Sequence, residues 1–258
     1  MTGGGYRAIA ATLREAILRG DYPPGSTLPK QQLLAAEHHV NVKTIRYAIQ
    51  LLATEGLVTP VRRRGTVVRA RPPMRRLGAE RYAKSKWKFG NVVAFIADRE
   101  ASGQPWNPTD QTQTVALVEA DAATAEAFGI DIGDRVYERA RLVRDASGSP
   151  THTLTSYYLP GDVEGTPLVD PAPGPAGRGG GFAVLTMQGL EPDTITETFH
   201  SREPTPAEIE QLALPAVGEP VVELHRTTMT RSGRVVEFAR GIHAASRFSW
   251  TYTFRIPE

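Results

Sequence analysis

Residues 40–68 read VNVKTIRYAIQLLATEGLVTPVRRRGTVV, and this stretch decides the fold of the first part of the chain. Ile45, Ile49 and Leu52 recur at helical spacing, which predicts an amphipathic helix. A turn of three consecutive arginines, residues 62–64, then separates two short apolar runs. A helix with a basic first turn can enter a major groove, and a basic hairpin behind it can grip the flanking backbone. The stretch is therefore typical of a recognition helix followed by a wing.

This third helix carries start and stop signals of its own. Asn41 precedes it and belongs to the residue types that cap helix N-termini through their side chains. Gly56 follows it and can adopt the left-handed conformation that ends a helix. The wing strands are expected over residues 57–60 and 66–69.

Two further helices are predicted ahead of the recognition helix. The first spans about Tyr6 to Arg19 with an apolar stripe at helical spacing. The second is short, about Lys30 to His38, and we expect Leu33, Leu34 and Ala36 in its core. Three helices followed by a two-stranded hairpin predict a winged helix-turn-helix.

The charge of the chain is divided unequally along its length. Residues 1–90 hold 17 Lys and Arg against 5 Asp and Glu, a net charge of +12. Residues 91–258 hold 13 Lys and Arg against 23 Asp and Glu, a net charge of −10. A basic module joined to an acidic one indicates that only the first module meets a polyanion, here double-stranded DNA.

The composition excludes several classes of protein and site. The chain has no cysteine, so disulfides, thiolate metal sites and cysteine nucleophiles are excluded, and its six histidines do not show the spacing of metal ligands. We predict neither a metal nor a cofactor. No apolar run approaches the roughly 20 residues that span a bilayer, and no signal peptide opens the chain. We therefore expect a cytoplasmic protein without a membrane partner.

The chain is expected to form two domains of an α+β protein. We assign residues 1–70 to the DNA-binding domain, residues 71–90 to a linker and residues 91–258 to a second domain. In the second domain strands are expected over residues 92–97, 112–120, 136–144, 151–159, 194–201, 220–230, 235–243 and 248–255, and helices over residues 124–128, 182–189 and 206–214. This order predicts an antiparallel sheet with flanking helices.

The second domain also contains an internal echo. Residues 133–150, GDRVYERARLVRDASGSP, resemble residues 218–235, GEPVVELHRTTMTRSGRV. Each copy reads as a glycine turn, a strand, a second glycine turn and the start of a returning strand, and a short helix precedes each. A duplicated helix-and-hairpin unit is expected to build one continuous sheet.

These stretches resemble a known family of bacterial proteins. Residues 22–29, YPPGSTLP, together with residues 40–48, 55–58 and 64–68, resemble the winged-helix domain of GntR-type transcription regulators. The echoed hairpins resemble the UTRA effector-binding domain of the HutC subfamily, which is similar in fold to chorismate lyase. The resemblance covers about residues 6–70 and 91–257, and it implies a homodimeric, ligand-responsive regulator of transcription.

The resemblance implies DNA contacts at three places: the start of the second helix, the recognition helix and the wing. The residues that fall there are Lys30, Gln31, Gln32, Lys43, Thr44, Arg46, Arg62, Arg63, Arg64 and Gly65. The chain departs from the family pattern at Asn41-Val42, where the family usually has Ser-Arg, at Gln31, where it has an acidic residue, and at Arg63, where it often has glycine. The operator is therefore not expected to be the usual one of the family.

The resemblance also implies an effector site in the second domain. Two arginines that hold the anion of a sugar phosphate in similar domains fall on Arg139 and Arg141, and two residues apart on a strand they face the same way. The other positions implied are Phe95, Ile96, Thr155, Glu237 and Phe248, with Trp106 and Tyr157 as further apolar walls. Thr155 and Phe248 stand where similar domains have a carboxylate and a tyrosine, which favours a less hydroxylated effector, aromatic or carboxylate-bearing, over a sugar phosphate.

Each of these positions also has a plain structural explanation. The wing arginines and Arg46 can be solvated surface charges, and Arg139 and Arg141 can pair with carboxylates such as Glu138 or Glu223. The structural alternative for Glu237 is an ion pair with Arg226 or Arg240, and for Thr155 and Phe248 it is core packing.

Three functions remain open from the sequence. The leading prediction is a repressor that a small-molecule effector releases from its operator. The second is an effector-blind DNA-binding regulator whose C-terminal domain only dimerises. The third is an enzyme with a DNA-binding head, but no set of nucleophile, base and orienting residue is visible, and we predict no catalytic residue. The effector, the operator, the regulated genes and the direction of control are not encoded in these patterns.

Overall fold

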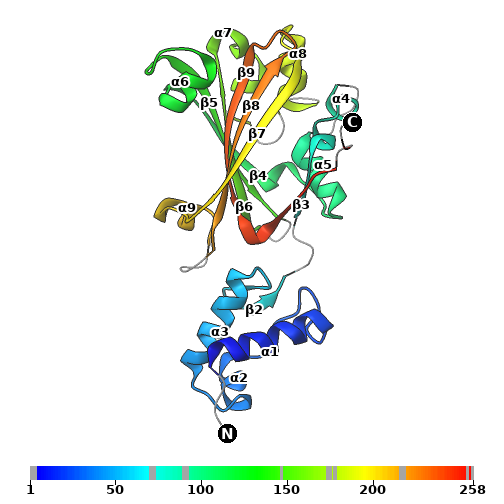
Figure 1. Ribbon diagram of the computed structural model, residues 1–258, viewed down its shortest axis with the longest axis vertical. Coiled ribbons are helices and arrows are strands. Elements are labelled where there is room, and N and C mark those ends of the chain that lie inside the picture. The colour runs from blue at the N-terminus through cyan, green and yellow to red at the C-terminus, as the bar shows by residue number, and fades with distance from the viewer. Residues whose placement is uncertain are drawn as a thin grey trace. The chain divides into compact units, whose positions relative to one another are not determined.

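A computed structural model of the chain describes residues 5–69, 74–88, 93–145, 148–172, 176, 179–214, 219–253 and 256. The chain divides into two compact units (Figure 1). The first is made mainly of the residues up to Pro73, and the second mainly of those from Met74 onward. Among the described residues, no helix has both the length and the apolar character needed to cross a membrane.

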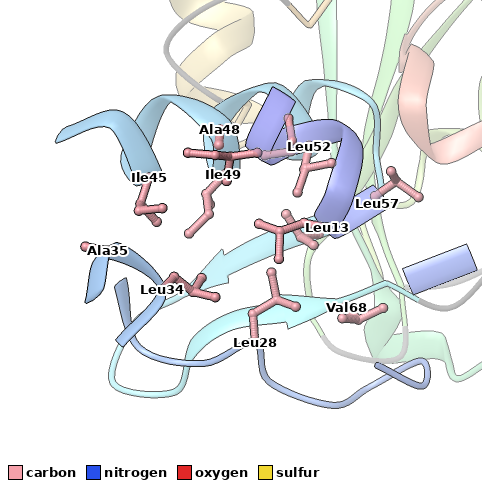
Figure 2. Close-up of a cluster of buried hydrophobic side chains, with 14 residues drawn as sticks. Leu13, Leu28, Leu34, Ala35, Ile45, Ala48, Ile49, Leu52, Leu57 and Val68 are labelled. Atoms are coloured by element: carbon pink, nitrogen blue, oxygen red, sulfur yellow. The ribbon is translucent and has the colours of Figure 1, made fainter. Parts of the chain in front are cut away.

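The first unit is a winged helix-turn-helix, as the sequence predicts. Its elements are α1 (Tyr6–Arg19), α2 (Gln31–Glu37), α3 (Val42–Thr54), β1 (Val58–Val61) and β2 (Gly65–Val68). Figure 2 shows their shared core, in which Leu13 of α1, Leu34 of α2 and Ile49 of α3 point toward one another. The core also takes in Leu28 and Val68, so the loop before α2 and the wing are packed onto the helices.

The short second helix buries a narrower face than we predicted. Leu34 and Ala35 are buried, whereas Leu33 is 60% exposed and Ala36 is also exposed. Leu33 and Ala36 are three positions apart and so share a helix face, and this face of α2 is the exposed one. The assignment of Leu33 and Ala36 to the core is wrong.

Local signals place the ends of α3. The Asn41 side chain accepts a hydrogen bond from the Thr44 amide at 2.9 Å, which confirms its role as N-cap. Gly56 has a φ of 69° just past the end of the helix. Arg14 of α1 donates two hydrogen bonds to the Glu55 carboxylate, at 2.7 and 2.5 Å, and so ties α1 to the end of α3.

The second unit is built on one six-stranded antiparallel sheet in the order β4-β5-β6-β9-β8-β7. Its strands are β4 (Gln111–Glu119), β5 (Arg135–Arg144), β6 (Pro150–Tyr158), β7 (Pro192–Arg202), β8 (Val221–Thr230) and β9 (Val235–Ala244). Two three-stranded meanders meet where β6 pairs with β9, with His152 opposite His243. The echoed stretches form the β5–β6 and β8–β9 hairpins, so the internal duplication is confirmed.

Helices cover both faces of this sheet. On one face α6 (Ala122–Phe128) packs over a core that includes Val136, Tyr157 and Phe238. The opposite face is covered by α7 (Pro160–Val163), the 3-10 turn η3 (Pro167–Val169) and α8 (Gly180–Met187). In Figure 1, α6 and α9 (Pro206–Gln211) lie to one side of the sheet, and α4 (Lys84–Trp87) and α5 (Ala94–Ala101) lie to the other.

The predicted linker is structured over most of its length. Residues 74–88, which we had assigned to the linker, form β3 (Met74–Leu77), the turn η1 (Ala79–Tyr82) and α4 (Lys84–Trp87) within the second unit. β3 pairs in parallel with β10 (Phe248–Thr251), about 170 residues away along the chain. The boundary between the units therefore lies near residue 73 and not at residue 90. The remaining short turns are η2 (Pro108–Asp110) and η4 (Ala245–Arg247).

The strand that we predicted over residues 92–97 is wrong. Residue 92 lies outside the described residues, and α5 (Ala94–Ala101) occupies the rest. Its buried face includes Asp98, whose carboxylate accepts from the Leu77 amide at 2.8 Å and pairs with Arg81 at 2.9 Å. A short apolar run does not reveal such buried polar partners, so its periodicity could not separate strand from helix.

Candidate DNA-binding surface and effector cavity

The recognition helix α3 presents a polar face opposite its buried one. Ile45, Ala48 and Ile49 face the core, while Lys43 and Arg46 are exposed. Side chains three and four positions apart share a helix face. The exposed side of α3 therefore carries two cations close to its N-terminus.

Two other residues of α3 modify this surface. Tyr47 is 46% exposed on the same face, and the Lys43 amine lies 6.0 Å from the centre of its ring. We had not included Tyr47 among the candidates, although its spacing from Lys43 was visible in the sequence. Thr44 is half-buried, and its hydroxyl donates to the Asn41 side chain at 3.2 Å.

The tip of the wing is fully exposed and cationic. Arg62, Arg63 and Arg64 all lie at the surface, and Arg63 adopts a φ of 65° to close the turn. Arg64 donates to the carbonyl of Gly25 at 2.8 Å, which links the wing to the loop before α2. Gly65 has a φ of 99°, a conformation that favours glycine.

The start of α2 adds one more cation. Lys30 is the exposed N-cap residue, Gln31 is half-buried and Gln32 is exposed. Like Lys43, Arg46, Arg62, Arg63 and Arg64, Lys30 forms no ion pair within 4 Å with any residue that the structure describes. These cations are available to an external polyanion.

The second unit encloses a cavity of about 110 Å³. It lies between the α8-covered face of the sheet and the segment from β3 to α5. Its lining residues are Arg76, Arg81, Tyr82, Trp87, Val93, Ala94, Phe95, Gln111, Arg139, Arg141, Val143, His152, Leu154, Tyr158, Leu168, Ala176, Gly179, Gly180, Gly181, Phe182, Leu224, Arg226, Glu237 and His243. Five of them are arginines, and one is a carboxylate.

Three of the five arginines are neutralised by acidic partners. Arg76 binds both carboxylate oxygens of Glu197, and Arg81 pairs with Asp98 at 2.9 Å. Arg226 donates to both oxygens of Glu237, at 3.0 and 2.9 Å. Arg76 and Arg81 were not among the predicted site residues, because residues 71–90 were assigned to a linker. Arg226 was named only as an ion-pair partner of Glu237.

Arg139 and Arg141 enter the same cavity from adjacent inward positions of β5, as their spacing predicted. Arg139 is 3% exposed and donates to the carbonyls of Leu168 and Asp170, at 3.0 and 2.9 Å. Burial, together with the charge of Arg141, lowers the pKa of Arg139 to about 10.

Arg141 is held by neutral groups. Its Nε donates to the carbonyl of Leu154 at 3.2 Å, and one terminal nitrogen donates to the Ser156 hydroxyl. Among the described residues it forms no ion pair within 4 Å, and burial lowers its pKa. The two carboxylates that we had named as ion-pair partners do not pair with Arg141. Glu223 pairs with Arg202 at 2.5 Å, and Glu138 lies on the other face of the strand.

Glu237 lines the cavity but is already fully engaged. Besides Arg226, it accepts from the Tyr158 hydroxyl and the Thr228 hydroxyl, both at 3.1 Å. Burial alone would raise its pKa, but the Arg226 charge and these hydrogen bonds lower it. The structure thus has the ion pair with Arg226 that was the structural alternative for this residue.

Two histidines form a flat part of the wall. The rings of His152 and His243 stack with centres 4.9 Å apart and planes at 4°. Burial and nearby cationic groups lower the pKa of His243 to about 3 and that of His152 well below its usual range. Both are therefore neutral at physiological pH.

Three predicted effector residues do not line the cavity. Ile96 lies on α5 beyond the lining residue Phe95, and Thr155 points to the opposite face of β6, because neighbouring strand residues alternate. Phe248 is 6% exposed and packs edge-on against His152 and His243, behind the wall.

The two further apolar walls that we predicted also lie elsewhere. Trp106 packs against the far side of Phe95, with ring centres 5.7 Å apart. Tyr157 belongs to the core under α6, on the other face of the sheet. Besides the predicted Phe95, the aromatic residues that line the cavity are Tyr82, Trp87, Tyr158 and Phe182, and the first two come from the stretch that we had assigned to a linker.

The run Gly179-Gly180-Gly181 closes one end of the cavity. A Cβ on Gly179 would lie 2.2 Å from the Trp87 carbonyl oxygen, and one on Gly180 would lie 2.4 Å from a methyl of Val93. Both glycines also have positive φ. Because these residues have no side chain, the start of α8 can pack closely against α4 and the residue that precedes α5.

Comparisons with known proteins agree with both units. Residues 5–68 match the model of the family described as bacterial regulatory proteins, gntR family, and residues 104–249 match that of the UTRA domain. An HTH-type transcriptional regulator of Streptomyces coelicolor is 52% identical over 98% of this chain and 93% of its own length. The HTH-type transcriptional repressor NagR of Bacillus subtilis is 21% identical over 96% of this chain and 93% of its own length.

Solved structures show the same arrangement of elements. A crystal structure of a GntR-family transcriptional regulator matches with a TM-score of 0.58 and 27% identity, covering 98% of both chains. PhnF from Mycobacterium smegmatis matches with a TM-score of 0.57 and 20% identity, over 96% of this chain and all of that chain, which shows the fold alone. The chain belongs to the GntR family of bacterial transcription regulators, in the branch whose DNA-binding winged helix is followed by a UTRA domain.

Proposed function

We propose that this DNA-binding regulator is a repressor that a small anionic effector releases from its operator. The observation that carries the proposal is the buried cavity of the UTRA domain, in which Arg141 has no ion-pair partner among the described residues. Arg141 is half-buried, and a cation held partly out of water without a counter-ion is costly, so an anionic ligand would offset that cost. The name of the relative NagR, a transcriptional repressor, supports the direction of control.

DNA recognition in this proposal uses the cationic surface of the first unit. Arg46 and Lys43 would contact base edges and phosphates from α3, and the wing arginines would contact the backbone. The candidates Thr44, Gly65, Gln31 and Gln32 would contribute through hydrogen bonds or a close backbone approach.

The route from effector to DNA is short along the chain. β2 ends at Val68, and the cavity-lining residues Arg76, Arg81 and Tyr82 follow within 14 residues. Tyr82 donates to Glu197 at 2.6 Å and accepts from Arg226 at 3.1 Å, so it joins this segment to the sheet. An effector that binds differently to two positions of this segment would shift the population of DNA-bound protein.

The test is binding of the purified full-length protein to its own upstream intergenic DNA, at fixed salt. A panel of small anionic metabolites, with acids and sugar phosphates both represented, is added in turn. Release by one compound supports the proposal. Tight binding that no compound changes would favour the effector-blind regulator, whose second domain only dimerises.

A further inference from the structure

We infer that the effector is a small monocarboxylic acid with a flat apolar body, and not a polyhydroxylated sugar phosphate. This inference rests on the proposed function, because it names the ligand class of the same cavity. Its evidence is the chemistry of the side chains that surround the space beside Arg141.

The size of the cavity sets the first limit. A cavity of about 150 Å³ is known to take up a single benzene ring in an engineered protein. The space here is about 110 Å³, smaller than that cavity, so a single ring is about the largest apolar body that it can take. A hexose phosphate carries about twice as many heavy atoms.

The polar groups set the second limit. Among its described lining residues the cavity has no serine, threonine, asparagine, aspartate or lysine. Glu237 is saturated by Arg226, Tyr158 and Thr228, and the hydroxyl of Tyr82 is engaged with Glu197 and Arg226. The several hydroxyl groups of a sugar would lose their hydrogen bonds to water without finding enough new partners.

The walls favour a flat apolar body. Aromatic rings line the cavity at Tyr82, Trp87, Phe95, Tyr158 and Phe182. The stacked rings of His152 and His243 add a neutral planar surface, and aliphatic side chains from the sheet fill the remaining positions. Ring-on-ring packing of this kind stabilises aromatic ligands beyond the burial of their area.

The charge favours one acid group. The Nε and one terminal nitrogen of Arg141 are used within the protein, and its Nη1 donates to no described residue. Arg139, on the same face, adds positive potential. Arg76, Arg81 and Arg226 are neutralised by carboxylates. One carboxylate of the ligand can therefore bind beside Arg141 and Arg139. A second acid group would meet only Arg76, Arg81 and Arg226, whose charges are already neutralised.

An adjoining groove sets the direction in which the body can extend. The groove has a volume of about 640 Å³ and shares Tyr82, Trp87 and Phe182 with the cavity. Its described charged lining residues, Lys84, Asp193 and Glu197, are all paired, so it offers no uncompensated cation to a second anionic group. A longer apolar substituent can enter it past the shared rings.

The test is isothermal titration calorimetry of the full-length protein, without DNA, with four probes: benzoate, gluconate, glucose 6-phosphate and inorganic phosphate. Benzoate and gluconate carry the same charge and differ in the body. We expect benzoate to bind at least about tenfold more tightly than the other three probes. Its ring packs against the aromatic walls, whereas the hydroxyl groups of the two sugar derivatives lose hydrogen bonds to water and inorganic phosphate has no apolar part.

Two variants then locate the site. Arg141→Gln is expected to weaken benzoate binding at least about tenfold, because a charge-assisted hydrogen bond is lost. Arg144→Gln is the matched control, since Arg144 lies on the same strand outside the cavity and donates to Thr112. Its benzoate affinity is expected to be unchanged.

The inference is overturned if glucose 6-phosphate or gluconate binds as tightly as benzoate, or if benzoate does not bind. Benzoate binding that Arg141→Gln leaves intact overturns it as well. The wild-type comparison stands even if the variant fails to fold. A sugar phosphate that binds and also releases the operator would refute the ligand class while leaving effector-controlled repression intact.

Discussion

Arg46 is the residue whose removal tests the assigned recognition helix most simply. It lies exposed on α3, and among the described residues no carboxylate lies within 4 Å of it. Arg46→Ala is expected to weaken operator binding by about 1–3 kcal/mol, the usual cost of losing an arginine contact to a base edge. Fluorescence anisotropy with labelled operator DNA at fixed salt measures this change.

The control for this variant is another exposed arginine of the same unit. Arg19 lies at the end of α1 and pairs with Asp21 at 2.8 Å, so its charge already has a partner. Arg19→Ala should keep most of the affinity, and both variants should keep the thermal midpoint of the wild type, because neither side chain is buried. Unchanged operator affinity in Arg46→Ala would contradict the assignment of α3 as the recognition helix.

Residue-level reasoning from the sequence succeeded where function depends on local spacing. The resemblance placed Arg139 and Arg141 in the effector site, their two-residue spacing predicted that both face the same way, and both line one cavity. It failed for Thr155, because the resemblance placed a residue on the wrong face of β6 and alternation along the strand decides the face. Whether any of these side chains contacts an effector stays a prediction.

At the scale of elements, the pairing of β6 with β9 joins the two halves of the sheet through a pair of buried histidines. His152 and His243 are opposite each other in register. The charged groups near them are Arg76, Arg81, Arg141 and Arg226, all cationic, and Phe248 of β10 packs on their edges. Burial and these charges hold both imidazoles neutral.

This arrangement predicts a loss of stability in mild acid. In the unfolded chain a histidine protonates at about pH 6.5, whereas in the folded protein the pKa of His243 is about 3 and that of His152 is also lowered. Below pH 6.5 the unfolded state therefore binds more protons, and the free energy of unfolding falls as the pH decreases. Each histidine contributes up to about 1.4 kcal/mol per pH unit.

Urea denaturation of the full-length protein at pH 7.5, 6 and 5 measures this dependence. His243→Asn should flatten it, because one of the two groups no longer titrates. His200→Gln, at an exposed histidine of β7, is the control and should keep the wild-type dependence. A free energy of unfolding that stays constant from pH 7.5 to 5 in the wild type would contradict the assignment of both rings as buried and neutral.

Elements were predictable from the sequence where their contacts are local. The helices of the first unit and the two echoed hairpins follow from periodicity and glycine turns, and the structure confirms them. β3 was missed because its partner β10 lies about 170 residues away and pairs in parallel. The same non-local pairing brings Arg76 and Tyr82 to the cavity, so half of the candidate site was beyond the reach of sequence patterns.

At the scale of the whole molecule, we expect a homodimer on DNA. A twofold dimer would place two recognition helices on half-sites about one helical turn, roughly 34 Å, apart. Light scattering after gel filtration should give twice the chain mass of 28.1 kDa, and a footprint on the upstream DNA should show two inverted half-sites. A monomeric mass together with a single half-site would contradict binding of a twofold dimer to the operator.

The central claim is that DNA binding and effector sensing are carried by separate surfaces of one chain. The most direct measurement is the operator affinity of the wild type and of Arg141→Gln, at fixed salt, with and without the compound that releases the wild type. The account predicts equal operator affinity for the two proteins without the compound, and release of the wild type alone when it is added. Equal release of both proteins, or a variant that no longer binds DNA although it folds, would contradict it.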